Sequence, residues 1–209
     1  MKTVRFRPVL FLIFLLLAVV SSPPLRAQNA AVAATLLRPP AGAKVALVEF
    51  ADLECPDCGR AAPLLDQAEK TYKIPLVIYD FPLPQHQWAF DASVYAHYFR
   101  SKSTKTNDLE RAFRLYIYSN QAQVTKDKLR SFVEKFAQEH KMSLPFVVDP
   151  QGKLADAVRA DKDKGTALGI QHTPTIYVVS NNRSGPPFVE VVDRKQLFNL
   201  IDEMQKEAK

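Results

Sequence analysis

Residues 50–58 read FADLECPDC and place two cysteines, Cys55 and Cys58, directly after an apolar run over 45–50 (VALVEF). A near-continuous apolar run of this length is typical of a buried central strand. In the residues after the cysteines, apolar side chains recur at helical spacing, and Pro56 stands where the first turn of a helix accepts proline. The stretch therefore predicts a strand that leads into a helix with the cysteine pair at its N-terminus.

A second apolar run over 74–79 predicts another strand, parallel to the first and joined to it by a right-handed crossover. Periodicity and turn residues predict the remaining elements. These are helices over 88–99, 109–117, 129–136 and 153–168, strands over 176–179 and 188–192 that pair as a hairpin, and a closing helix over 197–204. The order predicts an α/β fold with a helical block between its two halves.

The first 27 residues have the architecture of a secretory signal, with a basic start, an apolar run over 9–20 and a small residue, Ala27, at the end. The run is shorter than the roughly 20 residues that a membrane-spanning helix needs. We expect cleavage after Ala27, with an uncleaved membrane anchor as the alternative. An extension over 28–43 then precedes one domain over 44–209, and the protein is expected to be periplasmic or otherwise exported.

The formal net charge of +6 is concentrated in this N-terminal segment. Lys2, Arg5, Arg7 and Arg26 lie within the first 27 residues, where no acid occurs, and removing these four charges from +6 leaves +2. A nucleic-acid-binding domain normally carries a basic patch of its own. Nucleic acid is therefore not expected as a partner.

Cys55 and Cys58 are the only cysteines of the chain. In an oxidising compartment, a lone pair that closes so short a loop is better interpreted as a redox couple than as a structural disulfide. Unpaired amides at a helix start stabilise a thiolate, so Cys55 is the predicted nucleophile and Cys58 the resolving cysteine. No cofactor is expected.

Zinc sites share the Cys-x-x-Cys spacing, and metal binding is the first alternative. A structural zinc site normally needs four ligands, and the chain has no second cysteine pair. The four histidines are scattered without ligand spacing, so no metal is predicted, although a copper-delivery protein stays open. These histidines are His86, His97, His140 and His172.

Residues 50–58 and residues 169–175 (GIQHTPT) resemble the two signature segments of the DsbA-like thiol-disulfide oxidoreductase family. The resemblance runs from about residue 44 to the C-terminus and includes 81–83 (FPL) with His86. It implies a thioredoxin-like fold with an inserted helical subdomain at about 85–168. It also implies that Pro174 is cis and that Thr173 and Pro174 belong to the substrate-binding site. The alternative is that this Thr-Pro pair only interrupts the chain before a strand.

Three further roles concern the surroundings of the cysteines. Glu49 stands where relatives carry a buried acid, which can relay the proton of the resolving thiol; an ordinary charge at a strand end is the alternative. Pro56, Asp57 and Glu54 are expected to tune the reduction potential of the cysteine pair. Strongly oxidising relatives carry Pro-His between the cysteines, where this chain has Pro56 and Asp57. Negative charge beside Cys55 disfavours its thiolate. We therefore expect a weaker oxidant than DsbA, whose reduction potential is about −120 mV, unless Asp57 points into solvent and its charge is screened.

The sequence predicts an enzyme that exchanges disulfides with exported protein substrates, most often as a disulfide donor recycled by a membrane or soluble redox partner. The alternatives are a periplasmic reductase or isomerase, and a thiol protein that handles metal. No dimerisation segment is visible, which favours a monomer and makes isomerase activity the weaker half of the second alternative.

Overall fold

The computed structural model describes residues 33, 35–104, 108–181 and 187–208. The predicted signal segment over 1–27, and residues 28–32 and 34 of the predicted extension, lie outside the described residues. Within the described ranges, no helix is both long enough and apolar enough to cross a membrane.

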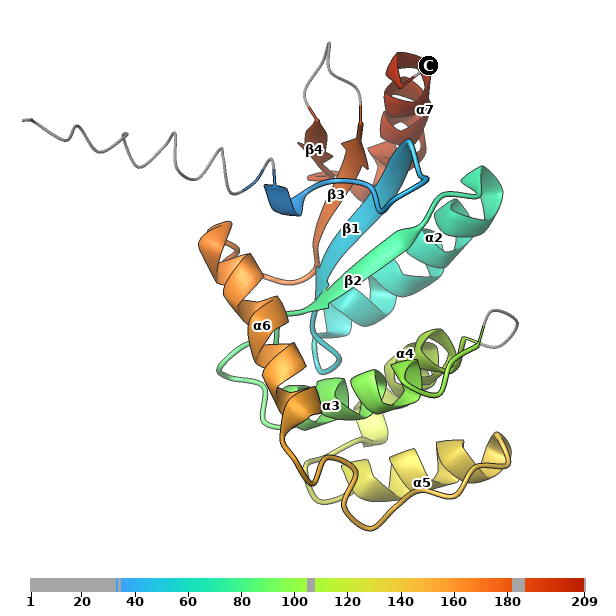
Figure 1. The fold of residues 1–209 in the computed structure, drawn as a ribbon, viewed down its shortest axis with the longest axis vertical. Helices are drawn as coiled ribbons and strands as arrows, with labels where there is room; N and C mark the ends of the chain where they lie inside the picture. The colour runs from blue at the N-terminus through green and yellow to red at the C-terminus, as the bar shows by residue number, and fades with distance from the viewer. Residues whose placement is uncertain (1–32, 34, 105–107, 182–186, 209) are drawn as a thin grey trace, which may run out of the picture.

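A four-stranded sheet with the order β2-β1-β3-β4 forms the centre of the molecule (Figure 1). Its strands are β1 (Val45–Ala51), β2 (Leu76–Asp80), β3 (Thr175–Ser180) and β4 (Phe188–Glu190). Strand β1 pairs in parallel with β2 and antiparallel with β3, and β3 pairs antiparallel with β4. Every residue of β1 is buried because this strand lies in the middle of the sheet, as its apolar sequence predicts.

Helices cover both faces of the sheet. Helices α2 (Pro56–Tyr72) and α7 (Leu197–Glu207) pack on one face around Leu47, Leu65 and Ile201. Helix α6 (Lys153–Ala167) lies across the other face, where the rings of Phe50 and Phe81 approach Gly165. A Cβ atom at Gly165 would come within 2.5 Å of the Phe81 ring, so this close packing requires glycine.

In the chain between β2 and β3, helices α3 (Ala89–Arg100), α4 (Leu109–Asn120) and α5 (Leu129–Glu139) form the predicted helical block, which lies below the sheet in Figure 1. Their aromatic side chains form its core: the Phe99 ring centroid lies 4.8 Å from those of both Phe113 and Phe136. Helix α6 contacts α3 as well as β2, so it connects the block to the sheet. The boundary of the insertion at about 85–168 stays a prediction.

The predicted elements are present, with small shifts at their ends. Strand β2 begins at Leu76 and not at Ile74, because Lys73 ends α2 in the left-handed region (φ 52°) and Pro75 has no N–H to donate. Strand β4 ends at Glu190, two residues earlier than predicted, and Val192 is exposed.

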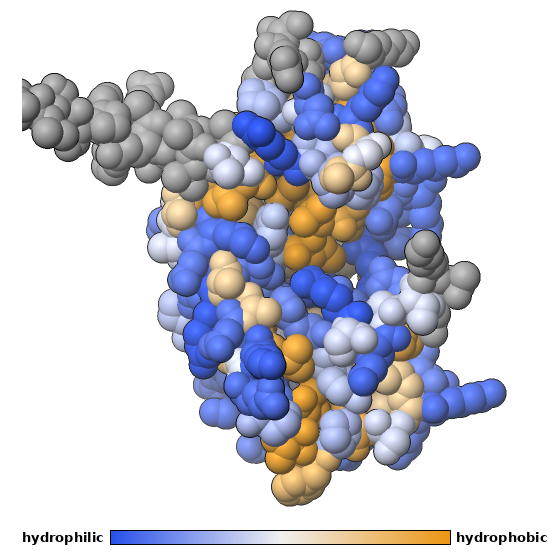
Figure 2. Space-filling view, viewed as in Figure 1, coloured by the Kyte–Doolittle hydropathy of each residue, from blue (hydrophilic) through white to orange (hydrophobic). Residues whose placement is uncertain are grey.

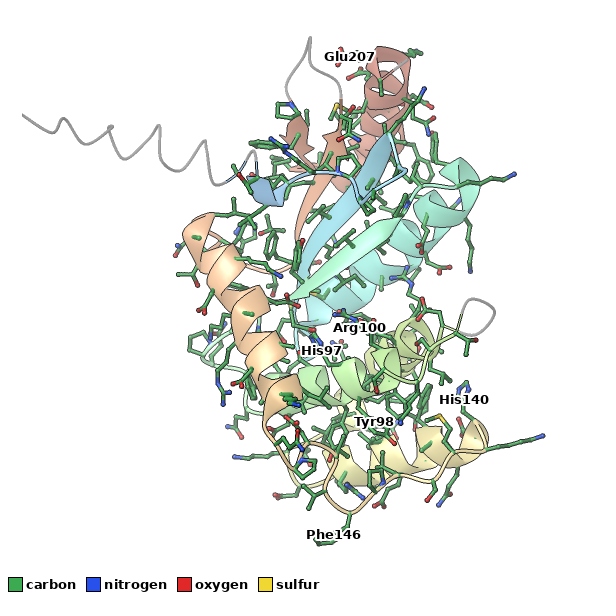
Figure 3. The ribbon with its side chains drawn as sticks, in the orientation of Figure 1. His97, Tyr98, Arg100, His140, Phe146 and Glu207 are labelled. Atoms are coloured by element: carbon green, nitrogen blue, oxygen red, sulfur yellow. The ribbon has the colours of Figure 1, made fainter. Side chains whose placement is uncertain are left out.

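The surface drawn in Figure 2 is mostly polar, with apolar side chains gathered over the strands and at the end of the molecule beside α5. Phe146 contributes to the second group and points away from the protein, as its label in Figure 3 shows. Most large apolar side chains of the described residues are buried or half-buried, and the exposed ones are Phe146, Val147 and Val192.

Candidate active site

The cysteine pair lies where β1 leads into α2. Cys55 is the N-cap of α2, with extended backbone angles (φ −74°, ψ 118°), and Pro56 follows in the first turn as predicted. Both side chains are free thiols; Cys55 is 7% exposed and Cys58 is fully buried. The more accessible sulfur therefore belongs to the residue at the helix start.

The two thiols differ in acidity. Hydrogen bonding with Cys58 is the largest cause that lowers the pKa of Cys55, to about 5, and the amides of Asp57 and Cys58 add to it against the opposing effect of burial. Burial raises the pKa of Cys58 far above its ordinary value, and its hydrogen bond with Cys55 and the charge of Glu49 act in the same direction. Cys55 is thus a thiolate at neutral pH, whereas Cys58 keeps its proton.

The loop before β3 lies against the cysteines. The Thr173–Pro174 peptide bond is cis, as the resemblance implies. The Cys55 Sγ lies 3.2 Å from the carbonyl oxygen of Thr173, to which it can donate in its thiol form, across 118 residues of sequence. Cys55 and Thr173 therefore meet in space, although their role toward a substrate stays a prediction.

Glu49 lies in β1 and is 2% exposed. Its Oε1 has no hydrogen-bond partner among the described residues. Burial raises the pKa of Glu49 to about 7, although the charges of Arg111 and Arg114 oppose the rise. The charge of Glu49 interacts electrostatically with Cys58. An acid with this pKa can accept or return a proton near neutral pH.

Comparisons with known proteins place this geometry in a family. The thioredoxin family matches residues 40–203, which is most of the chain. The chain belongs to this thioredoxin family. No curated protein sequence matches it significantly.

Several solved structures share the fold of this chain. Wolbachia pipientis alpha-DsbA1 has a TM-score of 0.66 at 16% identity, over 87% of this chain and 97% of that one. The catalytic domain of Proteus mirabilis ScsC has a TM-score of 0.61 at 20% identity, over 86% of this chain and 98% of that one. A periplasmic thioredoxin-like protein from Salmonella enterica serovar Typhimurium has a TM-score of 0.62 at 17% identity, over 79% of this chain and 87% of that one. The predicted DsbA-like thioredoxin fold is confirmed, and membership of the thioredoxin family supports the predicted oxidoreductase class.

The two acids expected to oppose the Cys55 thiolate have partners in this thioredoxin-family site. The Asp57 Oδ1 lies 2.6 Å from Arg194 Nη2 and 3.1 Å from Arg60 Nη2, and the contact with Arg194 is the main cause that lowers the pKa of Asp57. The Glu54 carboxylate instead accepts from two backbone amides at the start of α3, those of Trp88 at 2.7 Å and Ala89 at 3.1 Å. Both negative charges have partners, so these acids oppose the Cys55 thiolate less than the sequence alone suggests, and the weaker oxidant stays a prediction.

Asp52 is a structural residue of the site that the sequence patterns did not single out. Its amide donates to Cys58 Sγ at 3.4 Å, and its buried carboxylate accepts from the amides of Glu54 (2.8 Å) and Leu83 (2.7 Å). The same carboxylate contacts His86 Nδ1 at 2.7 Å. Asp52 thus joins the FADLEC and FPL segments, and their co-occurrence in the sequence was the available signal.

Gln121 is a second such residue, and it comes from the helical block. Its Nε2 donates to the carbonyl oxygens of Leu53 (2.8 Å) and Cys55 (3.0 Å). Gly59 makes room for this contact, because a Cβ atom there would lie 2.8 Å from Gln121 Oε1. Gln121 stands in no motif, and no sequence signal connects it with the cysteines.

Removing this contact should destabilise the protein. Gln121→Ala removes the side-chain donor to the carbonyl groups of Leu53 and Cys55, of which only the Cys55 carbonyl also accepts from the Gly59 amide, so we expect a loss of about 1–2 kcal/mol in the free energy of unfolding, measured by urea denaturation. Gln123→Ala removes an exposed side chain of the same turn and should change it by less than about 0.5 kcal/mol. Equal effects of the two substitutions would contradict the role of Gln121.

A separate buried cluster could be taken for a metal site. Asp80, His97 and Asp161 place ligand atoms within 4.8 Å of one another, and Figure 3 shows His97 between α3 and the sheet. However, Arg114 donates to both oxygens of Asp80, at 2.9 and 2.7 Å, and Lys164 donates to Asp161 at 2.8 Å. These carboxylates are already bound by cations, so the cluster is an ion-pair network.

Proposed function

We propose that the protein is an exported thiol-disulfide oxidoreductase that acts on protein substrates through Cys55 and Cys58, most often as a disulfide donor. The observation that carries the proposal is the contrast between the two thiols: Cys55 has a pKa of about 5 at the helix start, and Cys58 is buried and protonated. A stable Cys55 thiolate favours the reduced pair, so the oxidised pair takes electrons from its substrates.

In the donor reaction, a substrate thiolate attacks Cys55 Sγ of the oxidised pair and breaks its bond to Cys58. The Cys58 thiolate that leaves takes a proton, for which Glu49 is the proposed donor. A second substrate thiolate then attacks the substrate sulfur of the mixed disulfide and displaces Cys55 as a thiolate. Two electrons pass from the substrate dithiol to the enzyme, and a membrane or soluble redox partner removes them.

The proposed binding surface is the segment that carries Thr173 and Pro174. Thr173 is buried and its carbonyl oxygen lies beside Cys55 Sγ, so an extended substrate that paired with this segment would present its sulfur to Cys55. The signal architecture over 1–27 supports export, and the periplasmic origin of a similar solved structure agrees with it. Cleavage after Ala27 and a monomeric state belong to the same proposal.

The direction of electron flow is tested by the redox state of the pair in the producing cells, measured by thiol alkylation. A donor is mostly oxidised, whereas a reductase or isomerase is mostly reduced. In vitro, the purified donor should oxidise a reduced substrate peptide stoichiometrically, and the Cys55→Ser/Cys58→Ser variant serves as the inactive control. Tight metal binding without any exchange would instead select the metal-handling alternative.

The reduction potential follows from the acidity of Cys55. Its pKa of about 5 lies between the values of about 3.5 in DsbA and about 7 in thioredoxin. We therefore expect a potential between about −270 and −120 mV, measured in glutathione buffers. A value below that of thioredoxin would contradict the donor proposal.

A further inference from the structure

Arg194 reaches the active site from a distant part of the chain. It opens the short 3₁₀ helix η2 (Arg194–Gln196), which precedes α7. Its Nη2 lies 2.6 Å from Asp57 Oδ1, and its Nη1 donates to the backbone carbonyl of Asp57 at 3.3 Å. The side chain of Asp193 fixes the start of this helix by accepting from the Lys195 amide at 3.0 Å. Arg194 therefore binds both the side chain and the backbone of a residue that lies between the two cysteines.

An acid at position 57 is unfavourable for the chemistry of Cys55. The Asp57 carboxylate lies in the first turn of α2, and an uncompensated negative charge there opposes the formation of a thiolate beside it. The other charges around the pair do not replace Arg194. Arg60 contacts Asp57 from within α2 but its side chain is 68% exposed, whereas Glu49 and Glu54 are themselves acidic.

We propose that Arg194 is a positioning residue for the redox pair: its guanidinium binds the Asp57 carboxylate and offsets its charge, which preserves the reactivity of Cys55. This inference rests on the proposed function, because it assigns the Arg194 contact to thiol chemistry. It explains how a Cys-Pro-Asp-Cys sequence keeps an acidic nucleophilic thiol. The contact also couples the segment before α7 to the active-site helix.

The test measures the thiolate of Cys55 in the full-length protein, by absorbance at 240 nm and by the rate of alkylation with iodoacetamide against pH. Arg194→Ala should raise the midpoint of both profiles by about half a unit to one unit, so that alkylation at pH 5 slows by about two- to fivefold. Asp57→Asn in the Arg194→Ala background should restore the midpoint. Arg194→Lys should keep most of the wild-type behaviour.

Lys195→Ala is the matched control, because it removes the same charge from the neighbouring exposed position. Its midpoint should stay at the wild-type value. If Arg194→Ala leaves the profiles unchanged, or if Asp57→Asn fails to restore them in a variant that keeps the wild-type circular dichroism, the inference is wrong. A shifted midpoint in a protein that exchanges no disulfides would sustain the role of Arg194 and defeat the proposed function instead.

Discussion

Glu49→Gln is expected to slow the attack of Cys58 on a mixed disulfide at Cys55, the reverse of the donor step in which Cys58 leaves, by about 100-fold at pH 7, within the range that one general acid or base contributes. The carboxyl group of Glu49 has a pKa of about 7 and is coupled to Cys58, so it can exchange the proton that the resolving thiol must lose or gain. Glutamine has nearly the same shape but carries no titratable proton. Quenched-flow kinetics that start from a mixed disulfide between Cys55 and a thiol peptide would measure the rate at which Cys58 releases the peptide.

The same substitution should stabilise the protein at alkaline pH. Folding raises the pKa of Glu49 from 4.5 to about 7, so the folded state holds a proton that the unfolded state has lost. Stability therefore falls as the pH rises through this window, and the fully buried charge costs about 3 kcal/mol above pH 7. Glu49→Gln should remove this loss, seen as a smaller difference in unfolding free energy between pH 4.5 and pH 8.

Glu134→Gln, at an exposed position in α5, is the control for both measurements. It should change neither the resolution rate nor the pH dependence of stability beyond about 0.5 kcal/mol. A Glu49→Gln protein that resolves mixed disulfides at the wild-type rate would remove Glu49 from the mechanism. If the rate falls but the pH dependence of stability persists, the acidity of another group must account for that dependence.

The elements of the fold could be predicted because their patterns are local. The buried run over 45–50, the proline after Cys55 and the helical spacing of the aromatic residues each depend on neighbours within a few turns of chain. The ends of the elements were less predictable. Lys73 adopts a left-handed conformation to end α2, which is unusual for a residue other than glycine and has no clear signal in a single sequence.

The site could be predicted only where its residues share a motif. The positions of Cys55, Cys58 and Thr173 followed from two short segments, but the partners of Asp57 and Glu54 did not. Arg194 meets Asp57 across 137 residues, and an ion pair of that kind leaves no periodic trace in the sequence. The sequence-based argument for a weaker oxidant than DsbA was incomplete for this reason: it counted the acids near Cys55 and could not count the cation and the amides that bind them.

The contact between the helical block and the sheet gives the second large prediction. Arg114 of α4 is 1% exposed and binds Asp80, at the end of β2, through two hydrogen bonds. Arg114→Met preserves most of the side-chain volume but leaves the buried Asp80 carboxylate without its main counter-charge. Breaking a buried ion pair from one side costs about 3–5 kcal/mol, so we expect the melting temperature to fall by about 10 °C.

Lys70→Met is the control, because the 73% exposed Lys70 side chain pairs with Asp66 on the surface. Its loss should cost less than about 1 kcal/mol. The two variants should also respond differently to pH. Burial opposes the charge of Asp80, but Arg114 and His97 outweigh it and hold the pKa of Asp80 well below its ordinary value. Its contribution to stability is therefore complete above about pH 4 and is lost as the pH falls further.

The stability difference between the wild type and Arg114→Met should consequently be greatest near neutral pH and shrink in acid, where Asp80 becomes protonated in the variant. His97 adds a second dependence of opposite sign. Burial opposes its charge, yet contacts with Asp161 and Asp80 raise its pKa, so its contribution is complete below about pH 6.5 and is lost as the pH rises. A difference that stayed constant from pH 3 to pH 8 would mean that Arg114 stabilises the block by packing, and that its charge is not what joins α4 to the sheet.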